Sequence, residues 1–263
     1  MELDSRVAML TGAGRLGTAI AVELARAGAS VGVVDVNAVA AAKVANVARA
    51  GGAPKATHVA ADVSNSSDVE RAVEAIQREL GPIDILVNAH GIFPNRPLLE
   101  MDEDEWDRVF AVNTRGTMLT CRAVARRLVD RGAPGAIVNI SSGAATSARA
   151  GASHYAGSKA AVNMLTHVFA IELGPHRIRV NAIAPGLILD EVLREGDPEH
   201  RSKYADMMLA MTPLRRTGAP EDIAPAVVFL ASDRSPWTTG SILEITGGSH
   251  AGRTHVPLSR DLR

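Results

Sequence analysis

The chain has 263 residues, enough to bury one large core or two small ones, and no linker-like segment divides it. Its 28 lysines and arginines nearly balance its 29 acidic residues, so the charge indicates neither a nucleic-acid partner nor an anionic membrane surface. A single cysteine, Cys121, excludes an internal disulfide, and no apolar run approaches the roughly 18 residues of a membrane span.

Short apolar runs alternate with alanine-rich amphipathic stretches along the chain. The predicted strands are residues 6–11, 30–35, 55–61, 83–88, 135–140, 177–183 and 241–245. Continuous apolar runs suit strands covered on both faces, and alternating strands and helices favour a parallel sheet with right-handed crossovers. The sequence therefore predicts a single doubly wound α/β domain over residues 1–250, whose ligand lies beyond the carboxyl ends of the strands.

Three segments lie outside this alternation. Residues 187–211 carry a Gly196-Asp197-Pro198 turn and several methionines, which predicts a lid over an apolar ligand or, alternatively, a solvated helical hairpin. Residues 251–263 form a polar C-terminal tail that could cross to a neighbouring subunit or be disordered. Residues 1–6 lack the apolar core of a secretory signal, so with only one cysteine we expect a cytoplasmic protein.

A glycine-rich turn joins the first predicted strand to the first predicted helix. In residues 11–17, Thr-Gly-Ala-Gly-Arg-Leu-Gly, glycines permit a sharp turn and a close approach of the backbone to a pyrophosphate. Asp35 ends the second strand about 20 residues further on, where a carboxylate can bind a ribose diol. The pattern predicts a dinucleotide site, and an ordinary βα turn with a solvated carboxylate is the alternative. The predicted contacts are Gly12, Gly14, Arg15, Leu16, Gly17 and Asp35.

Tyr155 and Lys159 stand four residues apart, which places a phenol and an ammonium on one helical face. A free phenol has a pKa of about 10 and is a poor acid or base near neutral pH unless a nearby cation stabilises its phenolate. Lys159 could be that cation. The alternative is an exposed tyrosine over a lysine, because this spacing recurs by chance.

The glycine turn and the Tyr-Lys pair, in this order, resemble the short-chain dehydrogenase/reductase family, and the resemblance covers residues 6–249. It implies a Rossmann fold. Asp62-Val63 resembles the family's adenine contact, and Asn88-Ala89-His90-Gly91 resembles its Asn-Asn-Ala-Gly segment. Pro185-Gly186, with Ile188 beyond it, resembles the family's nicotinamide-side turn. Asn113 and Ser142 stand where the family has the Asn and Ser of its catalytic tetrad.

The resemblance implies hydride transfer between NAD(H) and a secondary alcohol or its ketone, a small-molecule reaction that uses no metal. Tyr155 would then move the hydroxyl proton, Lys159 would lower its pKa and hold the nicotinamide ribose, Ser142 would bind the carbonyl oxygen, and Asn113 would hold a water linked to Lys159. A helix-capping serine and a core amide are the local alternatives. An NAD(H) sensor without turnover, or a related lyase or isomerase, is the alternative function.

The choice of cofactor and the assembly are further expectations. Asp35 repels a 2′-phosphate and favours NAD, although Arg15 could pair with that phosphate. Family resemblance also implies a homotetramer, with interfaces on the predicted helix over 118–128 and on the one that carries Tyr155. The second of these helices presents extra apolar residues at Ala160, Ala161, Leu165, Val168 and Phe169.

Three departures from the family pattern accompany these matches. The glycine turn is one residue shorter and carries Arg15 where a glycine is usual, and Asp190 replaces a common threonine. His90 replaces an alanine, which we interpret first as packing or a local hydrogen bond. We expect a largely apolar substrate pocket with His154 and either Arg96 or Arg149 at its rim. Its other expected lining residues are Phe93, Ala144, Ala145 and Leu187.

Overall fold

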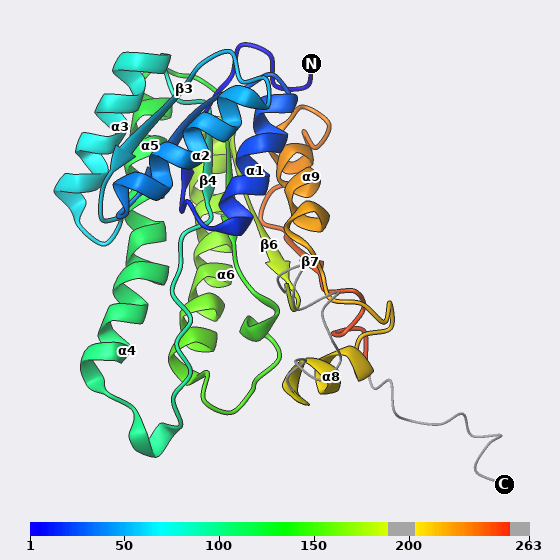
Figure 1. Cartoon of the computed structure of the whole chain (residues 1–263). Coiled ribbons are helices and arrows are strands. Elements are labelled where there is room, and N and C mark those ends of the chain that lie inside the picture. The colour runs from blue at the N-terminus through cyan, green and yellow to red at the C-terminus, as the bar shows by residue number, and fades with distance from the viewer. Residues whose placement is uncertain (189–202, 253–263) are drawn as a thin grey trace, which may run out of the picture.

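Seven parallel strands form one sheet in the computed structural model, which describes residues 1–188 and 203–252 (Figure 1). The strands are β1 (Val7–Thr11), β2 (Ser30–Asp35), β3 (Ala56–Ala60), β4 (Ile85–Asn88), β5 (Gly135–Ile140), β6 (Ile178–Pro185) and β7 (Ile242–Ile245). Their order in the sheet is β3-β2-β1-β4-β5-β6-β7. Strands β2 and β3 are added on one side of β1 and the last four strands on its other side, so the order of addition switches between β1 and β4. All seven predicted strands and the doubly wound α/β fold are confirmed.

Helices cover both faces of the sheet. The helices α1 (Arg15–Arg26), α2 (Ala38–Ala50) and α9 (Pro220–Ala231) pack on one face, and α3 (Ser66–Leu80), α5 (Gly116–Asp130) and α6 (Ser153–Leu173) pack on the other. Each face has its own apolar cluster, with Ile20 and Leu24 of α1 in the first and Ile76 of α3 in the second. Because the sheet is covered on both sides, every residue of β1 and β4 is buried.

Local capping explains where two of these helices begin. The side-chain oxygen of Asn37 accepts hydrogen bonds from the backbone N–H groups of Val39 and Ala40 at the start of α2. Asn65 does the same at the start of α3. These bonds satisfy N–H groups that have no partner within the helix, so the chain enters both helices at fixed points after β2 and β3.

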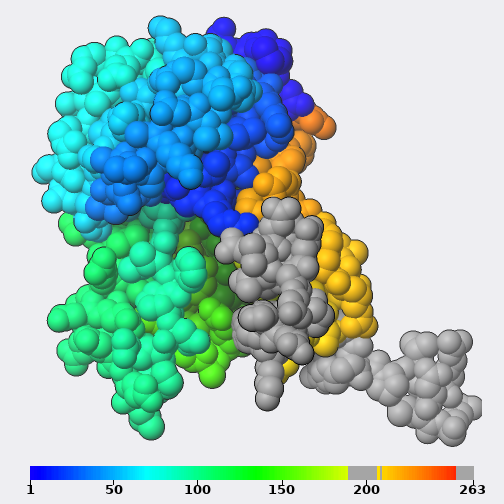
Figure 2. All heavy atoms as spheres, in the orientation of Figure 1, coloured from blue at the N-terminus to red at the C-terminus, as the bar shows by residue number. Residues whose placement is uncertain are grey.

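The elements beyond the carboxyl ends of the strands include α4 (Glu103–Phe110) and α8 (Lys203–Ala210), both at the lower end of Figure 1. The helix α4 continues through a π-helical turn, Ala111–Arg115, into α5. Short 3-10 helices occupy Leu98–Glu100, Gly143–Ala145 and Gly174–His176. The space-filling view shows the same division, with residues 1–80 above and the segments around α4, α6 and α8 below (Figure 2).

Parts of the predicted lid and tail lie outside the described residues. Of the predicted lid, residues 187–188 and 203–211 are described, the latter containing α8, and residues 189–202, including Asp190, are not. Of the tail, only residues 251–252 are described. Within the described parts of the chain, no helix is both long and apolar enough to span a bilayer.

Candidate active site

The glycine turn after β1 requires glycine at two positions. Gly12 has a φ of +93°, and a Cβ there would lie 2.7 Å from the backbone nitrogen of His90. A Cβ on Gly17 would lie 2.0 Å from the Gly12 carbonyl oxygen. By contrast, nothing lies within 4 Å of a Cβ built on Gly14, which precedes α1. The turn is therefore tight on the side of the protein and open at the start of the helix, where an anion can approach the first N–H groups.

Asp35 lies at the same turn. Its carboxylate accepts hydrogen bonds from the backbone N–H of Ala13 at 2.7 Å and of Asn37 at 2.8 Å. These two bonds hold the carboxylate between the glycine turn and the end of β2. Arg15 is exposed at the first position of α1. Asp35 is thus bonded to the glycine turn, and Arg15 follows that turn at the start of α1.

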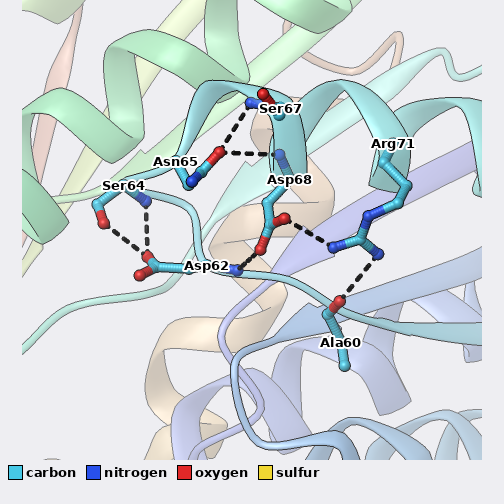
Figure 3. A network of polar contacts seen from close by, with 7 residues as sticks. All are labelled: Ala60, Asp62, Ser64, Asn65, Ser67, Asp68 and Arg71. Carbon is cyan, nitrogen blue, oxygen red and sulfur yellow. Dashed lines mark hydrogen bonds and ion pairs between the residues drawn. The ribbon is translucent and has the colours of Figure 1, made fainter.

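A network of polar contacts shapes the turn after β3, where Asp62 was predicted to contact adenine (Figure 3). One carboxylate oxygen of Asp62 accepts hydrogen bonds from the N–H and the hydroxyl of Ser64 at 2.8 and 2.7 Å. The backbone N–H of Asp62 donates to Asp68, and this bond, with the Arg71 guanidinium, lowers the pKa of the Asp68 carboxyl. Asp62 itself is exposed, and the adjacent Val63 is buried. The network therefore holds an exposed carboxylate beside the site.

The side chain of Asn88 is buried between β4, β5 and α5. Its side-chain amide donates to Asn139 at 2.9 Å and to the Cys121 sulfur at 3.3 Å, and its oxygen accepts from the Thr120 hydroxyl at 2.8 Å. All four side chains are buried. The side chain of Asn88 thus joins β4 to β5 and α5, and a contact between Asn88 and a cofactor stays a prediction.

His90 is buried behind the glycine turn. Its Nδ1 atom lies 2.6 Å from the hydroxyl oxygen of Thr11, and its Nε2 atom lies 3.5 Å from that of Thr117. Burial lowers the pKa of His90 to about 3, and the charge of Lys159 adds to that effect. The imidazole is therefore neutral at physiological pH. This geometry agrees with the interpretation of His90 as a packing and hydrogen-bonding residue.

Tyr155 and Ser142 come together where α6 begins and β5 ends. A hydrogen bond from Ser142 and the positive charge of Arg149 both act to lower the pKa of the Tyr155 phenol, but burial outweighs them and raises it. The Ser142 hydroxyl also accepts a bond from the backbone N–H of Ala144 at 3.1 Å. Ser142 thus caps the 3-10 helix Gly143–Ala145, which was the alternative role given to it, and it also contacts the phenol.

Lys159 is buried against the end of β5. Its ammonium donates to the carbonyl oxygen of Ile140 at 2.8 Å, and burial lowers its pKa to about 8. The phenol pKa is raised, whereas the sequence predicted that Lys159 would lower it. Burial therefore dominates the pKa of the phenol, and the effect of Lys159 on it stays a prediction.

Asn113 lies in the π-helical turn and is fully buried. Its amide oxygen accepts from the N–H of Ile92 at 2.9 Å, and its amide nitrogen donates to the Ile92 carbonyl and to the Ser158 hydroxyl, both at 2.9 Å. A Cβ on Gly91 would lie 3.3 Å from the Asn113 oxygen and 3.4 Å from Lys159 Nζ. Asn113 therefore fixes the segment after β4 directly against the buried lysine.

Comparison with known proteins connects this geometry to a family. A family model described as enoyl-(acyl carrier protein) reductase matches residues 12–250. A (3R)-3-hydroxyacyl-CoA dehydrogenase from Mus musculus is 41% identical over 94% of this chain and 97% of its own length. A short-chain type dehydrogenase/reductase from Mycobacterium marinum superimposes with a TM-score of 0.87 at 34% identity, covering 95% of this chain and 97% of that one. The chain belongs to the short-chain dehydrogenase/reductase family.

One further structure of similar fold was solved with ligands. It is a gluconate 5-dehydrogenase from Burkholderia cenocepacia in complex with NADP and tartrate, with a TM-score of 0.88 and 33% identity over 96% of this chain and 98% of that one. The named relatives are dehydrogenases, and membership of their family makes this protein an oxidoreductase.

The substrate side of this short-chain dehydrogenase/reductase differs from prediction at two residues. Arg96 forms a two-point ion pair with Glu105, at 2.8 and 3.2 Å, which raises the pKa of Arg96. His154 is fully buried against Trp106, with its Nε2 atom 3.4 Å from Glu105. Neither residue lies free at the rim of a pocket, because α4 supplies partners that the local sequence does not indicate.

The predicted pocket residue Phe93 lies beside the phenol, and two predicted cofactor contacts lie in the turn after β6. Phe93 is 71% exposed and meets Tyr155 edge-on, with ring centroids 6.2 Å apart. Gly186 at the end of β6 donates its N–H to the Ile245 carbonyl, and a Cβ there would lie 2.8 Å from Thr246. Ile188 is half-buried and forms a parallel bridge with Gly218. These contacts fix the described turn after β6 against the end of β7.

Proposed function

We propose that this protein transfers hydride between NAD(H) and a secondary alcohol or its ketone. The observation that carries the proposal is the convergence of Ser142, Tyr155, Lys159 and Asn113 at one end of the sheet. The phenol contacts the serine, and the lysine and the asparagine meet at Gly91. Family membership supports an oxidoreductase, and this cluster supports proton transfer to and from a substrate oxygen.

The residues present fit a dinucleotide. The open start of α1 after Gly14 would receive the pyrophosphate, and Gly12 and Gly17 leave room for it by keeping the turn tight. Asp35 would bind the adenosine ribose, and the exposed Asp62 would lie at the adenine. The segments ending at Gly91 and at Gly186 would flank the nicotinamide end. Bound NAD would supply the hydride acceptor, and NADH the donor.

The residues of the chain would supply the acid–base chemistry. In oxidation, Tyr155 would take the proton from the substrate hydroxyl, and Ser142 would donate a hydrogen bond to the substrate oxygen. Lys159, whose pKa is about 8, gains and loses a proton close to neutral pH, which suits a relay behind the phenol. Asn113 would hold the loop against which Lys159 packs, which keeps the two groups in one geometry.

NAD rather than NADP is the cofactor that the charges favour. A 2′-phosphate would have to lie beside the Asp35 carboxylate, which two backbone N–H groups hold in place. Like charges at that distance cost several kcal/mol. Arg15 is at the surface, where it can turn toward the pyrophosphate. One similar protein was solved with NADP, so the preference rests on Asp35 and not on family membership.

The test is a screen of secondary alcohols with NAD and of ketones with NADH, followed by the absorbance of the reduced nicotinamide. For any substrate found, Tyr155→Phe should abolish turnover and leave NADH binding, measured by fluorescence, nearly unchanged. Activity of Tyr155→Phe within a few-fold of the parent contradicts the assignment of the phenol. Tight NADH binding without turnover on any alcohol or ketone indicates the sensor function instead.

A further inference from the structure

A second polar cluster lies near the catalytic candidates and is formed by Thr146, Glu244 and His250. The Thr146 hydroxyl oxygen is 3.5 Å from a carboxylate oxygen of Glu244 and 3.5 Å from Nδ1 of His250, and those two atoms are 3.6 Å apart. Good hydrogen bonds between such atoms are about 2.7–3.2 Å long. The three groups therefore face one another without saturating one another, and each keeps capacity for a ligand.

The fold brings this cluster to the catalytic serine from a distant part of the chain. Strand β7 carries Glu244 alongside the end of β6, opposite Ala184. A turn at the glycines of 247–248, both with positive φ, then brings His250 back to the sheet. The imidazole packs so closely on Gly143 that a Cβ there would lie 2.4 Å from His250 Cε1. Gly143 directly follows Ser142.

The cluster is partly exposed at the surface of the described chain. The Glu244 side chain is 41% exposed and the His250 side chain 15% exposed, and Thr146 is exposed at the end of the loop that begins with Ser142. A substrate oxygen held by Ser142 would lie one residue along the chain from Gly143, on which the His250 imidazole packs. None of the three has a role in the proton transfer proposed above.

The chemistry of the three groups selects one kind of ligand. A carboxylate accepts hydrogen bonds only, whereas a threonine hydroxyl donates and accepts, and an imidazole does either according to its tautomer. A hydroxyl group can donate to Glu244 and accept from Thr146 or His250 at once. A carboxylate on the substrate would be repelled by Glu244, and an alkyl group would displace water from these groups without offering a hydrogen bond in return.

We propose that Thr146, Glu244 and His250 form a subsite for a second hydroxyl group of the substrate, next to the carbinol that is oxidised. The preferred substrates are then neutral alcohols with an additional hydroxyl, in preference to simple alcohols or hydroxy acids. This inference rests on the proposed function, because the subsite is defined relative to Ser142.

Three four-carbon alcohols with the same reacting group test the subsite: 2,3-butanediol, 2-butanol and 3-hydroxybutyrate. The parent should have the highest kcat/KM for the diol, by about tenfold over 2-butanol, the effect of about one or two hydrogen bonds. His250→Phe and Thr146→Val keep the shape and remove a polar group, so they should reduce kcat/KM for the diol about tenfold and that for 2-butanol less than about threefold. Glu244→Gln should raise the activity on 3-hydroxybutyrate relative to the diol.

Glu74→Gln is the matched control, since it removes the same charge from an exposed residue of α3. It should leave all three kcat/KM values unchanged. Equal losses for the diol and 2-butanol in the His250 and Thr146 variants would show a structural role and overturn the subsite. A parent that oxidises 2-butanol as well as the diol also overturns it, while leaving the proposed function standing.

Binding tests the subsite separately from turnover. Acetoin and 2-butanone differ by the same hydroxyl, and the shift in Tm that each produces in the presence of NADH gives its Kd. Acetoin should bind about tenfold more tightly to the parent and equally to His250→Phe. Equal binding of the two ketones to the parent contradicts the subsite. A parent that discriminates between them but turns over no alcohol or ketone contradicts the proposed function alone.

Discussion

Replacing Lys159 with methionine should stabilise the fold while it removes activity. Burial lowers the pKa of Lys159 from 10.5 to about 8. At about 1.36 kcal/mol for each pKa unit, the buried ammonium destabilises the folded protein by about 3 kcal/mol at neutral pH. Methionine also loses the hydrogen bond to the Ile140 carbonyl, which contributes about 1 kcal/mol. Lys159→Met should therefore raise the free energy of unfolding by about 2 kcal/mol at pH 7.

The pH dependence gives this prediction its sign. Because the folded pKa lies below the unfolded one, the penalty of the charge is fully present below pH 8 and declines as the folded lysine loses its proton. It is absent above pH 10.5, the ordinary pKa. Urea unfolding without cofactor should thus show a gain at pH 7 that disappears by pH 10.5, where only the lost hydrogen bond remains.

A matched control and an activity assay complete this experiment. Lys43 is exposed on α2, so Lys43→Met should change stability little and equally at both pH values. The kcat/KM of Lys159→Met should fall by about a hundredfold or more, the scale of a lost acid–base group. A variant that is less stable than the parent at pH 7, by the same amount as at pH 10.5, would refute the argument that the buried charge is destabilising.

Three further predictions follow from the charges and surfaces of the structure. In a Tyr204→Phe background Tyr155 is the only tyrosine, so ultraviolet titration without cofactor should show a phenol that ionises above pH 10. Ser142→Ala should raise the pKa of that phenol further. A phenol pKa below 10 contradicts the effect of burial. The parent should prefer NAD over NADP by at least about tenfold in kcat/KM. Asp35→Ala should narrow this ratio, because it weakens the binding of NAD and lets NADP bind. A parent that uses both cofactors equally contradicts the role of Asp35. Helix α6 exposes Met164, Val168 and Ile171 on one stripe, with Ile171 77% exposed. Light scattering should therefore show a homotetramer at micromolar concentration, and Ile171→Asp should weaken that homotetramer. A clean 27.6 kDa species contradicts the assembly.

The exposed surfaces of α5 and α6 refine the assembly prediction. Both helices were expected to contribute interfaces. On α5 the exposed positions include Arg122 and Arg126, while Leu119 and Ala123 are buried in the core. On α6 the sequence singled out Phe169, which is partly buried against the core, whereas Met164 and Ile171 are exposed. The proposed homotetramer therefore relies most on the apolar stripe of α6.

The sequence alone predicted the fold, and it also predicted where along the chain the candidate site lies. Apolar runs and their spacing predicted seven strands and their parallel arrangement, because these patterns reflect local geometry and burial on both faces. The glycines of residues 11–17 were also readable, since a turn this tight leaves no room for a Cβ at Gly12 or Gly17. The spacing of Tyr155 and Lys159 predicted a pair, and resemblance to the family added Ser142 to it.

Only the tertiary structure decided what these groups do to one another. Arg96 and His154 looked free until α4 brought Glu105 to them, and burial raises the pKa of the Tyr155 phenol. His250 reaches Gly143 across more than a hundred residues. Pairings, pKa values and subsites of this kind depend on distances between segments remote in sequence, and local periodicity carries no information about those distances.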